Sequence, residues 1–221
     1  MYNSIFAKTD FYINNLLAEE DNALRHAIES IISEGISQES ISPAQGKLLQ
    51  VLMTSCNAKR VLELGTLGGY STIWMAKALP EDGKIVTVEA IEKHATVAQK
   101  NFQYAGLSGK VELINGKALD VLTEMVKTPN VTFDFIFIDA DKPPYTEYFE
   151  FAMKLSRKGT IIVCDNVIRA GKVLDAESTD EKVRGVRRFN EMLSKNTGVI
   201  ATIIQSVGVK EHDGMSIAVV K

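Results

Sequence analysis

From residue 60 onward, short apolar runs rich in β-branched residues alternate with longer amphipathic stretches. These runs predict five strands, at 60–64, 84–89, 110–115, 133–139 and 160–165. Strands that alternate with helices need crossover connections, and such connections build a mostly parallel sheet with helices on both faces. The near-continuous apolar character of 133–138 and 160–164 fits strands that are buried on both sides.

The last part of the chain predicts a helix near 180–195 and then two more strands, at 199–207 and 214–221. The polar loop between these strands is too short for a parallel crossover, so we expect them to pair antiparallel. The predicted fold class is therefore α/β, a doubly wound, seven-stranded, mostly parallel sheet with an antiparallel last strand.

The first part of the chain has a helical pattern instead. We expect helices at roughly 9–20, 22–34 and 43–56, the last of them beginning with Ser42 as N-cap and a proline at the first helical position. We interpret residues 1–57 as an N-terminal helical cap on a core at 58–221. Because 221 residues without repeats or low-complexity segments fit one domain, we expect a single domain at 1–221.

Composition excludes several function classes. The net charge is −3 and the isoelectric point is about 5.7, with basic and acidic residues interleaved, so nucleic acid and anionic membranes are not the expected partners. No signal peptide and no run of 18 apolar residues is present, which predicts a cytoplasmic location. The two cysteines and three histidines are isolated, so neither a disulfide nor a zinc site is expected.

In open sheets of this kind, ligands bind beyond the carboxyl ends of the strands. Polar residues gather at these ends, namely Glu63 with Gly65, Glu89, Asn115 with Gly116, Asp139, and Asp165 with Asn166. The chain therefore predicts one polar site along a single edge of the sheet.

The turn after the first strand reads ELGTLGGYST, and its glycines let the backbone approach a ligand. Glu89 ends the second strand, where a doubly wound fold places a carboxylate that accepts hydrogen bonds from ribose hydroxyls. A second acid in the turn, Glu63, would repel a pyrophosphate but suits a ligand that carries an ammonium and a sulfonium. Charge thus favours S-adenosylmethionine, although the turn and Glu89 alone also permit an NAD-binding oxidoreductase.

Two further motifs, FIDADK at 137–142 and CDNV at 164–167, end strands that should be neighbours. Asp139, Asp165 and Asn166 form an oxygen-only ligand set, which suits Mg²⁺, Mn²⁺ or Ca²⁺. Acids at strand ends can instead serve only as caps of the next helix. Burying them together without a cation would be costly, which favours a divalent metal with Lys142 beside it.

Together these motifs resemble class I S-adenosylmethionine-dependent, metal-dependent O-methyltransferases of the caffeoyl-CoA and catechol O-methyltransferase type. The resemblance runs from about Ile41 to the C-terminus, and DADKPPYTEY followed by DNV is its most specific part. It implies a Rossmann-like methyltransferase fold, S-adenosylmethionine as cofactor and a divalent metal, with magnesium preferred. It also favours a homodimer.

The resemblance assigns a role to each motif position. In the metal and acceptor half, Asp139, Asp165 and Asn166 would hold the metal, and Lys142 and Asp139 would be catalytic, with Lys142 taking the hydroxyl proton. The cofactor-binding residues would be Glu63 and Asp139 beside the ligand, Ile41 over its methionine part, the Gly65 and Thr66 backbone, Ser71 at its carboxylate, Glu89 at the ribose, Ala118 at the adenine and Asp141 near the ammonium.

We therefore expect direct methyl transfer to a hydroxyl of a small catechol-like or phenolic acceptor, without a covalent enzyme intermediate. One alternative is a tRNA hydroxyuridine methyltransferase, against which the acidic isoelectric point speaks. Arg169 departs from the family pattern, in which an aromatic residue is common after the DN motif. It either prefers an anionic or polar acceptor or points to water.

Overall fold

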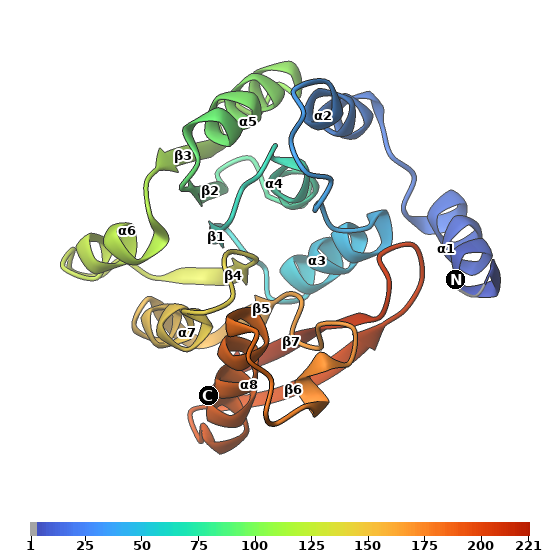
Figure 1. Ribbon diagram of the computed structural model, residues 1–221. Helices are drawn as coiled ribbons and strands as arrows, with labels where there is room; N and C mark the ends of the chain where they lie inside the picture. The colour runs from blue at the N-terminus through green and yellow to red at the C-terminus, as the bar shows by residue number, and fades with distance from the viewer. Residues whose placement is uncertain (1–3) are drawn as a thin grey trace.

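The computed structural model describes residues 4–221, and a single sheet forms its centre (Figure 1). Its strands are β1 (Arg60–Leu64), β2 (Lys84–Glu89), β3 (Val111–Asn115), β4 (Phe133–Ile138), β5 (Ser156–Cys164), β6 (Val199–Ser206) and β7 (Asp213–Val220). They lie in the order β3-β2-β1-β4-β5-β7-β6. Strand β7 is antiparallel to β5 and to β6, and the other pairs are parallel. The predicted sheet, with its seven strands and antiparallel end, is confirmed.

Helices cover both faces of this sheet. The described residues form the helices α1 (Ser4–Leu17), α2 (Asn22–Ser33), α3 (Pro43–Ser55), α4 (Tyr70–Ala76), α5 (Glu92–Tyr104), α6 (Ala118–Met125), α7 (Tyr145–Lys154) and α8 (Glu181–Lys195), with a 3₁₀ turn η1 (Lys172–Leu174). Figure 1 shows α6, α7 and α8 on one face and α3, α4 and α5 on the other. Within residues 4–221, no helix combines the length and apolar character needed to cross a membrane.

The hydrophobic core has two layers, one on each face of the central strands. Side chains of successive strand residues point to opposite faces. Accordingly Val61 and Phe135 pack in the cluster with α2 to α5, whereas Leu62 and Ile136 pack in the cluster with α6 to α8. Both faces of β1, β4 and β5 are therefore apolar, which explains the continuous hydrophobic runs in their sequences.

The helix starts follow their capping residues. At α3 the Ser42 hydroxyl accepts from the Gln45 N–H and the Gln45 side chain accepts from the Ser42 N–H, so the predicted start is confirmed as a capping box. The first predicted helix, at 9–20, is confirmed as a helix but its bounds are wrong, because α1 runs from Ser4 to Leu17. The chain leaves the helix so that Asp21 can cap α2 and Glu20 can accept a hydrogen bond from the Tyr70 hydroxyl at 2.7 Å.

The fifth strand begins four residues earlier than predicted, at Ser156 instead of Thr160. Its first residues are polar, which hid them in the sequence pattern. Arg157 binds the Asp134 carboxylate at 2.7 Å, and the Thr160 hydroxyl donates to the carbonyl of Phe133 at 2.7 Å. The register between β4 and β5 shifts at this point, so the early residues pair irregularly.

Helix α8 packs closely on the loop before α7. A Cβ atom at Gly185 would lie 2.5 Å from the carbonyl oxygen of Lys142 and 2.6 Å from the Cα of Pro143. Only glycine therefore permits this approach of helix to loop.

We predict that Gly185→Ala lowers the free energy of unfolding by ~1–3 kcal/mol, because overpacking outweighs the better helix propensity of alanine. Urea denaturation measures this difference. Gly109→Ala is the matched control, because a Cβ atom there meets no atom within 4 Å. Equal stability of the two variants would contradict the close packing of α8.

Candidate functional site

One large cavity opens at the carboxyl ends of β1, β2, β4 and β5, with a volume of ≈ 1090 Å³. At one end, which we name the glycine end, it is lined by the turn at 65–71 and by Glu89 and Ala118. At the other, the acidic end, it is lined by Asp139, Lys142, Asp165 and Asn166. The two halves predicted from the sequence thus lie in one cavity.

Backbone hydrogen bonds at the sheet edge bring these segments together. The Asp139 N–H donates to the Leu64 carbonyl at 2.8 Å, and the Asp165 N–H donates to the Ile138 carbonyl at 3.0 Å. Because β4 lies between β1 and β5, Asp139 and Asp165 follow neighbouring strands, as predicted.

Gly65 joins the two ends of the cavity. Its φ is +92°, in the region that favours glycine, and a Cβ atom there would collide with the carbonyl oxygen of Asp139. The turn after β1 can therefore lie directly against the end of β4 only with glycine at this position.

Glu63 lies beneath the cavity instead of in the turn where we expected it. It is the fourth residue of β1, so its side chain points to the same face as Val61, under α4. The carboxylate is fully buried and accepts hydrogen bonds from the hydroxyls of Ser71 at 2.5 Å, Thr87 at 2.6 Å and Thr72. Burial raises the pKa of Glu63 to about 7, although these hydroxyls oppose the shift.

Glu89 holds the glycine end in shape. Its carboxylate accepts hydrogen bonds from the N–H groups of Leu67 at 2.8 Å, Ile91 at 2.9 Å and Thr66 at 3.2 Å. The side chain also lines the cavity, so it can serve a ligand while it orders the turn. Its predicted contact with a ribose stays a prediction.

Most of the other predicted cofactor-binding residues also line the cavity, namely Ile41, Gly65, Thr66, Ser71, Ala118, Asp139 and Asp141. The Ser71 hydroxyl donates its hydrogen bond to Glu63. Its oxygen can therefore accept a hydrogen bond from a ligand, but it can donate to a ligand only if the bond to Glu63 breaks. The Asp141 carboxylate accepts from the Tyr148 hydroxyl at 2.5 Å. The individual ligand contacts of these residues remain predictions.

At the acidic end, Lys142 is buried and its ammonium has two partners. Nζ donates to Asp139 Oδ1 at 2.9 Å and to the Tyr145 hydroxyl at 2.7 Å. The Tyr145 hydroxyl in turn donates to the Asp165 carbonyl at 2.9 Å. Lys142 follows Asp139 by three residues in a segment that is not helical, because α7 begins at Tyr145.

Asp165 is only 2% exposed, and burial, together with the nearby Asp139 carboxylate, raises its pKa. Gln45 Nε2 lies 3.4 Å from both of its carboxylate oxygens. The next residue, Asn166, has a φ of +57°, a left-handed conformation that asparagine tolerates well.

This donor set fits a hard divalent ion. Two carboxylates and one amide oxygen follow adjacent strand ends, and a dication would compensate the buried charge of Asp165. Within residues 4–221, no three His, Cys, Asp or Glu side chains form a metal-binding group, so an ion here would need the Asn166 amide as its third protein ligand.

Sequence reasoning missed three residues at this site. Gln45 has a recognisable capping motif, but nothing in the sequence shows that its amide reaches Asp165. Tyr145 stands in the DADKPPYTEY motif without an assigned role, although it is fully buried against Lys142. Lys210, in the loop between β6 and β7, lines the cavity and had no sequence signal.

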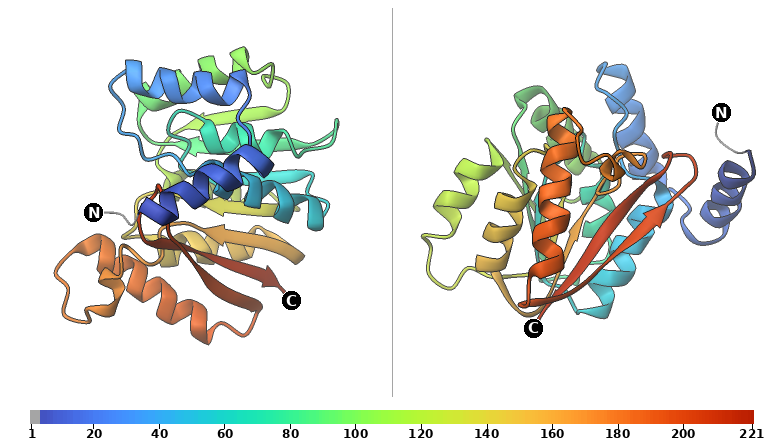
Figure 2. Two further views of the ribbon diagram at one scale, coloured as in Figure 1. Left: turned by 90° about the vertical axis from the view of Figure 1, so that its right-hand side faces the viewer. Right: turned by 60° about the horizontal axis from the view of Figure 1, so that its bottom comes forward.

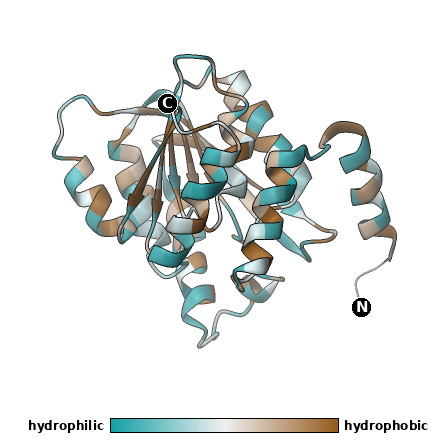
Figure 3. Cartoon of the chain, turned by 90° about the horizontal axis from the view of Figure 1, so that it is seen from above, coloured by the Kyte–Doolittle hydropathy of each residue, from teal (hydrophilic) through white to brown (hydrophobic). Residues whose placement is uncertain are grey.

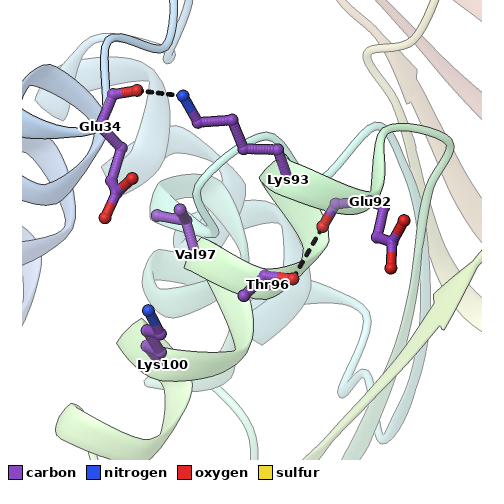
Figure 4. A pocket seen from close by; sticks show the side chains of 6 residues that line it. All are labelled: Glu34, Glu92, Lys93, Thr96, Val97 and Lys100. Carbon is purple, nitrogen blue, oxygen red and sulfur yellow. Dashed lines mark hydrogen bonds between the residues drawn. The ribbon is translucent and has the colours of Figure 1, made fainter.

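A second hollow, of ≈ 330 Å³, lies between the end of α2 and α5, away from the strand ends. Figure 4 shows two hydrogen bonds in it, both to backbone carbonyls: Lys93 donates to the Glu34 carbonyl, and the Thr96 hydroxyl donates to the Glu92 carbonyl. The large cavity, with its converging carboxylates, is therefore the candidate site.

The chain is similar to known O-methyltransferases. The family model described as O-methyltransferase matches residues 14–219. A catechol O-methyltransferase of Niastella koreensis is 58% identical over 221 residues, covering 100% of both chains. An O-methyltransferase from Bacillus cereus, solved in complex with SAH, superposes with a TM-score of 0.95 at 44% identity and 99% coverage of both chains. TomG from Streptomyces achromogenes, solved with SAM, gives 0.96 at 42% identity, covering 100% of this chain and 99% of its own.

We predict that Glu63 lowers the stability of the fold as the pH rises. Because its folded pKa of about 7 lies above the value of 4.5 for an ordinary glutamate, the folded state keeps a proton that the unfolded chain has already lost, so stability falls as the pH rises between these two values. The loss of stability has an upper limit of ~3–4 kcal/mol, at about 1.4 kcal/mol for each pKa unit. Glu63→Gln should remove it.

Urea denaturation from pH 5 to pH 8 measures this difference between the native protein and Glu63→Gln. The exposed Glu112→Gln on β3 is the control. A difference between native protein and Glu63→Gln that stays constant with pH would show that Glu63 does not titrate in this range.

Proposed function

This chain belongs to the O-methyltransferase family, and we propose that it methylates a hydroxyl of a small catechol-like acceptor with S-adenosylmethionine and a divalent metal. One observation carries the proposal. Asp139, Asp165 and Asn166 follow adjacent strand ends, beside a buried lysine and in the same cavity as the glycine turn. Residues 58–221 would supply this site, and residues 1–57 would cover it as part of a single domain.

The glycine end is the proposed place of the cofactor. S-adenosylmethionine, when bound, supplies a methyl group on a sulfonium, which is attacked directly. Ile41, Gly65 and Thr66 would contact its methionine part, Ser71 its carboxylate, Glu89 its ribose, Ala118 its adenine and Asp141 the region of its ammonium. Glu63 would act indirectly, by fixing Ser71 beneath the cavity. The SAH and SAM bound in the two structural relatives support this assignment.

The acidic end is the proposed place of the metal and the acceptor. Asp139, Asp165 and Asn166 would hold the ion, with Mg²⁺ preferred and Mn²⁺ or Ca²⁺ compatible with the ligands. The ion, when bound, supplies positive charge that positions two neighbouring acceptor oxygens and favours loss of a proton. Gln45 steadies the Asp165 carboxylate from the side of α3.

Lys142 is the proposed base. Two of its hydrogen-bonding directions are taken by Asp139 and Tyr145, which leaves one for the acceptor hydroxyl. As the neutral amine, Lys142 would keep its two N–H hydrogen bonds to Asp139 and Tyr145 and use its lone pair to take the hydroxyl proton, which returns it to the ammonium and leaves the acceptor oxygen as the nucleophile for methyl transfer. Because Tyr145 and Asp139 fix Nζ, little reorganisation is needed when the acceptor binds.

We also propose a homodimer. Helix α1 lies at the margin of the molecule (Figure 3). Its exposed apolar side chains include Phe11, Tyr12, Leu16 and Leu17. It lies beside the turn between β6 and β7 (Figure 2), and the edge strand β6 exposes Ile200 and Ile204. Exposed apolar side chains on neighbouring elements are typical of a contact between subunits.

We predict that the double variant Phe11→Asp/Leu17→Asp sediments as a monomer, whereas the native protein sediments as a dimer, because two carboxylates on α1 cannot be desolvated in the contact. Analytical ultracentrifugation over a range of concentrations measures this. Leu174→Asp, on an 88% exposed side chain in η1, is the control. A native monomer, or an unaffected double variant, would contradict the proposed contact.

We predict that Lys142→Met and Asp165→Asn each lower kcat/KM for methylation of catechol with Mg²⁺ by at least about 100-fold, a loss typical of a missing base or a disturbed metal site. Binding of S-adenosylhomocysteine, measured by calorimetry, should change little, because the glycine end is intact. The exposed Asp82→Asn, in the turn before β2, should keep full activity.

A chelator should abolish the activity of the native protein, and added Mg²⁺ should restore it. Methylation that persists in Asp165→Asn and in the presence of chelator would refute the metal site. Methylation of bulk tRNA without methylation of catechol would refute the small-molecule acceptor.

A further inference from the structure

Three cationic side chains besides Lys142 surround the acidic end of the cavity. Arg169 lies in the loop after β5, Lys182 in the first turn of α8, and Lys210 in the loop between β6 and β7. They come from three separate segments, yet all line the same cavity. None of them has a part in the proposed methyl transfer.

The loop that carries Arg169 is fixed by its backbone. Arg169 has a φ of +54°, and the Asp213 carboxylate accepts from the N–H groups of Arg169 at 2.9 Å, Ile168 at 3.0 Å and Gly214 at 2.9 Å. Asp213 is therefore occupied by backbone groups. Within the described part of the chain, the half-buried guanidinium of Arg169 makes no hydrogen bond or ion pair, so its donors remain for a ligand.

Lys210 is held beside the cavity by contacts of its loop with α1 and with the segment before α3. The Val209 N–H donates to Asp10 Oδ2 at 2.8 Å, which fixes the loop against α1, and Lys210 Nζ lies 3.3 Å from the Gln38 carbonyl. Burial lowers the pKa of Lys210, and Asp139, Asp165 and Glu39 oppose that shift, so its charge lies within reach of the acidic end. No carboxylate among residues 4–221 forms an ion pair with it.

The acids near these cations are mostly occupied. Asp139 is bound by Lys142, and Asp165 accepts from Gln45 and from the Asn166 N–H. Glu39 and Glu211 are exposed at the rim. Arg169 and Lys210 thus present positive charge to the space beside the proposed metal ligands. A neutral catechol bound there would leave this positive charge without an anionic partner.

We propose that Arg169 and Lys210 bind a carboxylate carried by the ring or short side chain of the catechol acceptor, with Lys182 adding positive charge at the rim. This inference rests on the proposed function and specifies its acceptor as a carboxylated catechol. A guanidinium and an ammonium suit a carboxylate, because charge-assisted hydrogen bonds of this kind are strong and directional.

The experiment compares kcat/KM for 3,4-dihydroxybenzoate and the neutral 3,4-dihydroxybenzamide, which have the same shape. The native protein should prefer the benzoate by about tenfold, the value of one charge-assisted hydrogen bond. Arg169→Gln and Lys210→Met should each lower kcat/KM for the benzoate by about tenfold and leave the benzamide within about twofold. Lys158→Met, on the amino-terminal part of β5, is the control and should change neither value.

Equal rates for benzoate and benzamide in the native protein would overturn the inference, and so would variants that lower both rates alike. In each of these cases methylation of unsubstituted catechol would still support the proposed function. Failure to methylate any of the three catechols would refute the proposed function itself. A higher kcat/KM for caffeoyl-coenzyme A than for caffeate would also overturn the inference, because phosphates would then be the anionic groups recognised.

Discussion

The pairing of β4 with β1 on one side and β5 on the other is the interaction on which the site depends. Two backbone hydrogen bonds, from Asp139 to Leu64 and from Asp165 to Ile138, continue this pairing just past the strand ends. They fix the two carboxylates on adjacent chains before any ligand is present. Gly65 completes the arrangement, because the missing side chain lets the turn after β1 lie against Asp139.

Below this edge, one buried polar side chain lies under the glycine end of the cavity and another lies under the acidic end. Glu63 lies under the glycine end with three hydroxyl donors, and Tyr145 lies under the acidic end between Lys142 and the Asp165 carbonyl. Burying polar groups is costly unless they are satisfied, so both groups confine their neighbours to one arrangement. The cavity residues are therefore ordered from beneath, by side chains that a ligand need not touch.

The sequence predicted the parts that follow from local periodicity. All seven strands and the acidic residues at their ends could be placed, because each strand carries its own apolar run. Glu63 was placed in the turn because sequence does not show which face a strand residue turns to. The roles of Tyr145 and Lys210 could not be predicted, since they depend on α7 packing under the sheet edge and on a loop 68 residues after Lys142 folding back over the same cavity. The early start of β5 was hidden by its polar first residues.

The hydrogen bond between Asp10 and Val209 connects the surface of the molecule to the interior of the site. Helix α1, which exposes most of its apolar residues, and the loop that carries Lys210 cannot move independently while this bond holds. Free-energy linkage is reciprocal, so an acceptor that orders the loop also orders α1, and a neighbour that orders α1 also orders the loop. The affinity of the subunits for each other would then be coupled to the affinity for the acceptor. The preference of the protein among acceptors would therefore depend on its concentration in the assay.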